Sequence, residues 1–141
     1  MWLDIKALAM GVIEEYGTND PFLIAQDINI NILFHELPES LDAYRLDDVI
    51  VLNINLSYEK QRWVLAHELG HYFIHGPENT LSNFITNRLQ LRSKCEKQAD
   101  LFASELLLSD LNKYIIEGLN ISQLAALAKV PEEFIIYKFS S

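Results

Sequence analysis

The chain has 141 residues, half of them hydrophobic, and its 11 Lys and Arg residues are outnumbered by 20 Asp and Glu residues. A chain of this size and composition can bury a core without disulfides, which excludes the disordered and the disulfide-rich classes of protein. The formal net charge of −9 argues against a partner that is nucleic acid or an anionic membrane surface. The single cysteine, and the absence of a signal-peptide pattern and of a bilayer-spanning apolar stretch, predict a cytoplasmic protein.

Hydrophobic periodicity divides the chain into helices, a small sheet and further helices. Apolar residues spaced three and four apart mark the helices, and an alternation with a period of two marks the strands. Because Leu46-Asp47-Asp48 fits a tight connection between antiparallel strands, we expect an antiparallel sheet. The expected elements are helices over 4–16 and about 21–28, strands from Ile28 to Phe34, near 42–46 and over 49–53, and helices over 58–75, 92–108, 110–117, 121–129 and 132–138.

This order of elements predicts an α+β fold with segregated helices and strands, and not a βαβ repeat. We expect one domain over 1–141. Its parts would be N-terminal helices and a small sheet over 1–56, two long helices within 57–108, and C-terminal helices over 109–141. The pattern over 78–90 is ambiguous.

The helix expected over 58–75 contains the sequence HExxH, with His67, Glu68 and His71 at its fixed positions. Histidines four apart lie on one face of a helix, one turn from each other, so both imidazoles can reach a single zinc ion. Glu68 is offset on the helix and is not a natural ligand of that ion. It can instead take a proton from a water at the metal and pass it to a leaving group. Gly70 is unfavourable inside a helix, which is explained if another element must approach closely there.

A catalytic zinc ion usually has three protein ligands and one open position. His75 is two turns from His67, so we interpret it as a residue at the helix C-terminus that interacts with the helix dipole. We interpret His35 as a surface or loop histidine and Cys95 as a small packed hydrophobe. Glu96 is the better candidate for the third ligand.

Glu96 and Asp100 are four apart on the helix expected over 92–108, beside its apolar face. Glu96 can be the third ligand, and Asp100 can accept a hydrogen bond from the far nitrogen of a ligand histidine. A buried pair of carboxylates needs a compensating cation, which zinc would supply. The alternative is a helix capping box, in which Ser93 caps the helix and Glu96 points at the backbone.

These segments resemble the ImmA/IrrE family of zinc metallo-endopeptidases, which phages and mobile elements often encode. The resemblance rests mainly on 51–55 together with 61–71, and on 96–108, and extends more loosely over most of the chain. It implies a minimal zincin-like, or gluzincin-like, α+β fold, with a small antiparallel sheet packed on the HExxH helix. The site that it implies has His67, His71 and Glu96 as Zn²⁺ ligands, Glu68 as the general base, and Asp100 hydrogen-bonded to a ligand.

The resemblance also implies a function, because members of the family act as antirepressors that cleave a helix-turn-helix repressor encoded nearby. The alternative is a protein that binds the repressor without cleaving it, or a toxin–antitoxin partner, with zinc in a structural role. Glu68 and an open zinc position separate the two, since a structural site needs neither. No direct contact with nucleic acid is expected, because Glu132 and Glu133 begin the last helix and would face the phosphates.

Overall fold

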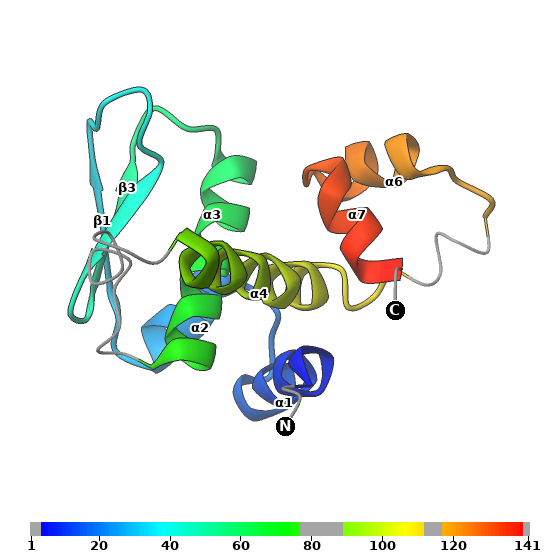
Figure 1. Ribbon diagram of the computed structural model, residues 1–141, viewed down its shortest axis with the longest axis horizontal. Helices are drawn as coiled ribbons and strands as arrows, with labels where there is room; N and C mark the ends of the chain where they lie inside the picture. Colours follow the sequence, from blue (N-terminus) through cyan, green and yellow to red (C-terminus); the bar gives the residue numbers. More distant parts are fainter. Residues whose placement is uncertain (1–3, 77–88, 112–116, 140–141) are drawn as a thin grey trace.

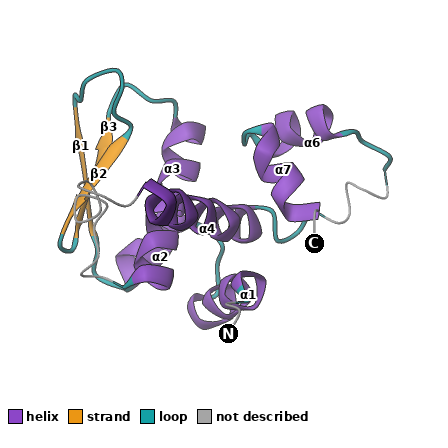
Figure 2. Ribbon diagram, in the orientation of Figure 1, coloured by secondary structure: helices purple, strands orange, loops and turns teal. Residues whose placement is uncertain are grey.

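A computed structural model describes residues 4–76, 89–111 and 117–139, and within these ranges it confirms the α+β class (Figures 1 and 2). The helix expected over 110–117 and the ambiguous segment over 78–90 lie mostly outside the described residues. None of the described helices is long and apolar enough to cross a membrane. The described elements are α1 (Ile5–Tyr16), α2 (Pro21–Asp27), β1 (Asn31–His35), β2 (Ala43–Leu46), β3 (Val49–Asn53), α3 (Tyr58–His75), α4 (Leu89–Leu107), α6 (Ile121–Ala128) and α7 (Glu132–Phe139).

Local capping fixes both ends of α3, the helix that carries the HExxH sequence. The Ser57 hydroxyl accepts a hydrogen bond from the Lys60 backbone N–H at 3.2 Å. At the other end Gly76 has a φ of 92°, which favours glycine, and the helix stops there. Asp4 and Asp20 cap α1 and α2 in the same way as Ser57 caps α3. The expected helix over 58–75 is therefore confirmed.

The sheet is mixed, so the expectation of a wholly antiparallel sheet was wrong. Its strand order is β1–β3–β2, with β2 antiparallel to β3 and β1 parallel to it. The tight connection between β2 and β3 was predicted correctly. β3 takes the central place because it is the most apolar strand, with Ile50 and Leu52 fully buried. β1 and β2 follow each other in the sequence but are not neighbours in the sheet, because β3 lies between them.

β1 begins later than the alternating pattern suggests and is more exposed. Ile28 ends α2, and Asn29 adopts a left-handed conformation with a φ of 62°. Ile30 is buried in the core just before the strand starts at Asn31. The first two isoleucines of the pattern therefore belong to the helix end and the core contact, and not to the strand.

α4 lies at the centre of the fold, where it packs against α1, α3 and α7 (Figure 1). Leu65 and Leu69 of α3 and Phe102 and Leu106 of α4 are completely buried in the shared core. The two helices approach each other closely at Gly70. A Cβ atom there would lie 2.9 Å from both the Cα and the carbonyl oxygen of Ala99. The close approach expected at this glycine is confirmed.

Gly70→Ala is expected to lower the free energy of unfolding by about 1 kcal/mol. Overpacking typically costs about 1–3 kcal/mol, and here the obstacle is backbone that cannot rotate away; a gain in helix propensity of about 1 kcal/mol offsets part of this cost. Urea unfolding measures the change. Gly11→Ala is the matched control, because Gly11 lies inside α1 with nothing within 4 Å of a new Cβ atom. That variant should gain about 1 kcal/mol, and equal effects of the two substitutions would contradict the packing argument.

α7 is fixed to α4 by two polar contacts and to α3 by a buried aromatic side chain. The buried Ser104 hydroxyl donates to the Phe134 carbonyl oxygen at 2.7 Å, and Lys138 Nζ lies 2.9 Å from Glu105 Oε1. The Phe134 ring is buried and meets the Trp63 ring of α3 edge-on. The start of α7 is thus held close to the face on which α3 and α4 meet.

Candidate metal centre

The crossing of α3 and α4 brings two histidines and one glutamate together. His67 and His71 lie one turn apart on α3, and Glu96 faces them from α4. His67 Nε2 lies 2.9 Å from Glu96 Oε1 and 3.2 Å from His71 Nε2, and His71 Nε2 lies 3.2 Å from Glu96 Oε2. Three side chains offer one potential ligand atom each, all within 4.8 Å of one another.

The donor set and its spacing fit a metal ion. Ligand atoms about 2.1 Å from one tetrahedral zinc ion lie roughly 3.4 Å apart, which is close to the separations found here. Glu96 Oε2 is buried and accepts no hydrogen bond of good geometry, although His71 Nε2 is 3.2 Å away. A buried carboxylate oxygen without a donor is costly, and a cation among the three ligand atoms would satisfy it.

Asp100 fixes the orientation of the His67 ring. Its Oδ1 atom lies 2.7 Å from His67 Nδ1, and since a carboxylate only accepts, the Nδ1–H group donates. The Nε2 lone pair of a neutral His67 therefore points at Glu96 and His71. Asp100 thus lies where it would orient His67 if that ring held a metal ion.

The cluster favours positive charge. Burial opposes the charged form of His67, but the hydrogen bonds to Asp100 and Glu96 outweigh it and raise its pKa to about 10. Burial likewise opposes ionisation of Glu96, yet the hydrogen bond from His67 and the closeness of both imidazoles bring its pKa well below the usual range. The His67 shift arises because two carboxylates flank one imidazole, and the Glu96 shift arises because two imidazoles flank one carboxylate. In the metal-free chain a proton supplies the cation that a metal would replace.

The helix boundaries exclude the capping-box alternative for Glu96. A capping box requires its serine to precede the first helical residue. α4 begins at Leu89, so Ser93 lies within the helix. Glu96 is consequently an interior residue of α4 whose side chain faces α3.

Glu68 lies beside the cluster and faces a cavity of about 250 Å³. It is half-buried and is not one of the three clustered side chains. His67 and Asp100 line the same cavity, which therefore reaches one side of the cluster. The lining residues are Asp42, Ala43, Trp63, Val64, His67, Glu68, Asp100 and Glu133. A substrate group in this cavity would contact Glu68 and the clustered His67 together.

The other sequence candidates do not join the cluster. His35 is exposed at the end of β1, and Cys95 is buried with a pKa that burial raises, so both match their expected roles. His75 ends α3 as expected, but the interpretation of it as a dipole partner was incomplete. Its Nδ1 atom lies 3.1 Å from His71 Nδ1, and its Nε2 atom 2.9 Å from Gln98 Oε1.

Two residues near the site were missed because they come from distant elements. Glu133 of α7 lines the cavity. From the sequence, its charge was expected only to oppose contact with nucleic acid. Arg45 of β2 is buried, donates to the Gly76 carbonyl oxygen at 3.4 Å, and is close enough to Glu68 to feel its charge. Burial lowers the pKa of Arg45, and Glu68 opposes this shift. The one sequence feature that could have pointed to Arg45 is that an arginine lies within a predicted strand.

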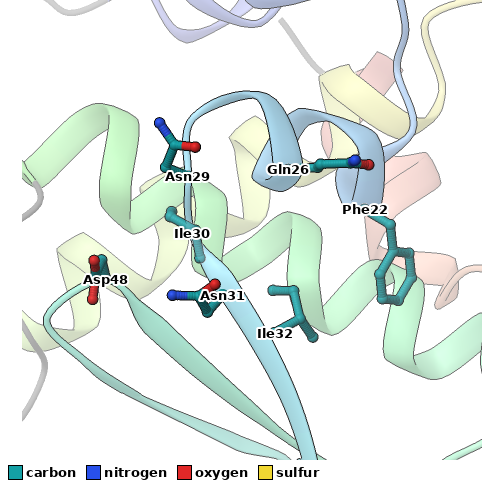
Figure 3. A pocket seen from close by; sticks show the side chains of 7 residues that line it. All are labelled: Phe22, Gln26, Asn29, Ile30, Asn31, Ile32 and Asp48. Atoms are coloured by element: carbon teal, nitrogen blue, oxygen red, sulfur yellow. The ribbon is translucent and has the colours of Figure 1, made fainter.

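A larger cavity lies at the other end of the sheet but lacks such a constellation. It has a volume of about 600 Å³ and lies between α2, the start of β1 and the β2–β3 connection (Figure 3). Its polar lining consists of three amides and Asp48, with no histidine or cysteine among the residues that line it. Of these two cavities, the one at the α3–α4 crossing therefore combines histidine and carboxylate groups. The residues lining the larger cavity are Phe22, Gln26, Asn29, Ile30, Asn31, Ile32 and Asp48.

The chain is similar to known proteins over most of its length. Residues 25–140 match the family described as the IrrE N-terminal-like domain. The chain is 38% identical over 143 residues to "Metallopeptidase ImmA" of Bacillus subtilis (strain 168), an alignment that covers 96% of this chain and 84% of the relative. It is 34% identical over 136 residues to "Uncharacterized immunity region protein 2" of Bacillus phage phi105, covering 92% and 85% respectively. The matched residues include the whole cluster.

Proposed function

Because this chain belongs to the ImmA/IrrE family and is a metallopeptidase, we propose that it is a zinc-dependent endopeptidase that cleaves a helix-turn-helix transcriptional repressor. It would act as the antirepressor of a phage or mobile element, in the cytoplasm. One observation carries the proposal: Glu68 and the clustered His67 line the same cavity, so a general base and a candidate metal ligand face one substrate space.

The proposed ligands are His67, His71 and Glu96, with Asp100 holding the His67 ring. Two imidazoles and one carboxylate form a donor set typical of catalytic zinc, whereas structural zinc sites are closed by four protein ligands, usually cysteine and histidine. Three ligand side chains leave one coordination position for water or substrate. The side chain of Glu96 is 34% exposed, so the cluster is accessible on one side. This arrangement supports a gluzincin-like catalytic site in a single domain over 1–141.

Peptide hydrolysis then follows from the positions of the chain's own residues. Zinc, when bound, would polarise the scissile carbonyl and lower the pKa of water. Glu68 takes the proton from the attacking water and returns it to the leaving amine. Asp100 keeps Nδ1 of His67 protonated, which leaves its Nε2 lone pair free for the metal. Ala43 and Trp63 of the cavity wall limit the space in which the scissile peptide can lie.

The identity of the substrate rests on the relatives and on charge. The relative from Bacillus phage phi105 is named for an immunity region, which supports a substrate that controls phage immunity, namely a repressor. The net charge of −9 disfavours direct contact with DNA and favours a protein substrate. The alternative, binding of the repressor without cleavage and with structural zinc, makes no use of the carboxylate of Glu68.

Cleavage of the helix-turn-helix repressor encoded beside this gene tests the proposal. The zinc-loaded protein is incubated with the repressor, and intact-mass spectrometry detects the products. Two fragments whose masses sum to the repressor plus one water are expected. Metal-stripped protein is the control: it should leave the repressor intact and regain activity with added zinc. An intact repressor held in a stable complex would instead establish binding without cleavage.

A further inference from the structure

The candidate ligand His71 has a second ring nitrogen that faces away from the cluster. Its Nδ1 atom lies 3.1 Å from Nδ1 of His75, which is one turn further along α3. The other nitrogen of His75, Nε2, lies 2.9 Å from Oε1 of Gln98 on α4. The two histidine rings lie 5.2 Å apart between centroids and are tilted by 40°. Three side chains thus form a chain of hydrogen-bonding contacts that ends at a proposed metal ligand.

The direction of donation along this chain follows from the chemistry of each group. The amide oxygen of Gln98 can only accept, so Nε2 of His75 carries the hydrogen. In a neutral imidazole the other nitrogen then has a lone pair, so Nδ1 of His75 accepts from the Nδ1–H group of His71. This leaves the lone pair of His71 at Nε2, the atom that faces His67 and Glu96. His71 is thereby in the tautomer that a metal requires.

We propose that Gln98 and His75 are positioning residues that hold His71 in its metal-binding tautomer and orientation. The inference rests on the proposed metal site but not on the proposed substrate. His71 is 4% exposed, so water has little access to its ring, and a protein group has to supply the acceptor for its Nδ1–H. His75 does so, in the way that Asp100 does for His67.

The arrangement gives α4 control over the two proposed histidine ligands of α3, His67 and His71. Asp100 acts on His67 directly, whereas Gln98 acts on His71 through His75. Glu96 belongs to the same helix. α4 thus carries one proposed ligand, the direct partner of His67, and Gln98, which contacts the partner of His71. Its packing against α3 therefore sets the geometry of all three proposed ligands.

Nitrogen-15 NMR of the histidine side chains tests the tautomer directly in the metal-free protein. His71 is expected to carry its hydrogen at Nδ1, and His75 at Nε2. The reverse pattern, with His71 protonated at Nε2 and His75 at Nδ1, would overturn the proposal. Gln98→Leu provides the second arm of this test. Because the leucine removes the acceptor that fixes His75, His71 should become a mixture of tautomers in this variant.

Zinc affinity separates positioning from a merely structural role. In competition with a chromophoric chelator, His75→Leu should bind zinc about 10- to 100-fold more weakly, the usual effect of losing an outer hydrogen-bond partner. His75→Asn keeps an acceptor near the place of Nδ1 and should restore most of that affinity. His35→Leu, at an exposed histidine of β1, is the control and should bind zinc like the wild type.

Two results in the affinity series would contradict the proposal. Wild-type affinity in His75→Leu would show that His71 needs no partner at Nδ1. Equal losses in His75→Leu and His75→Asn would show that His75 only fills space. Neither measurement involves the repressor, so failure of this proposal is distinguishable from failure of the proposed proteolysis.

Discussion

Glu68→Gln is expected to lower kcat about 10²- to 10⁴-fold, the range by which a positioned general base accelerates a reaction. The amide is nearly the same size as the carboxylate but cannot take a proton. Glu68 is not one of the three clustered side chains, so the variant should bind zinc with wild-type stoichiometry and affinity. Substrate binding should change little, which places the effect in kcat and not in KM. Cleavage rates from intact-mass time courses, with zinc content measured in parallel, check both parts.

A matched control for Glu68→Gln lies on the same helix. Glu59 is in the first turn of α3, and Glu59→Gln makes the same chemical change away from the cluster. It should retain wild-type kcat. Cleavage at the wild-type rate by Glu68→Gln would exclude Glu68 as the general base. Loss of zinc from that variant would instead show that Glu68 contributes to metal binding.

Glu96→Gln is expected to weaken zinc binding by more than about 100-fold, because changes to outer partners alone cost about 10- to 100-fold. The substitution removes the only carboxylate among the three clustered side chains. A neutral amide leaves the cation with two imidazoles and less compensating charge. Competition titration with a chelator measures the affinity, and cleavage activity should fall in parallel at limiting zinc.

Glu133→Gln is the control for this effect, because Glu133 lines the adjoining cavity without belonging to the cluster. Its zinc affinity should stay at the wild-type value. Unchanged zinc affinity in Glu96→Gln would remove Glu96 from the ligand set. In that event a further donor would have to come from elsewhere in the chain, and the proposed geometry would be wrong.

The sequence by itself determined the local part of the candidate site. Histidines four apart on a helix of 3.6 residues per turn share a face whatever surrounds them. The ends of α3 were equally local, because Ser57 supplies a cap through its own side chain and Gly76 tolerates a positive φ. The apolar content of β3 likewise predicted a buried strand, which the structure places at the centre of the sheet.

Only the tertiary structure decided which residues approach the face of α3 that carries His67 and His71. In the sequence, Glu96 fits both a helix capping box and a metal ligand. The start of α4 at Leu89 decides between these two roles. The close approach at Gly70 brings α4 near enough for Glu96 to reach His67, and no local pattern encodes that crossing. β1 pairs in parallel because β3 inserts between the first two strands, a choice made by burial. The contacts of His75 with Gln98 and the position of Glu133 also depend on how separate helices pack. Periodicity and capping act within a few residues of the chain, whereas these contacts arise only when distant segments share one core.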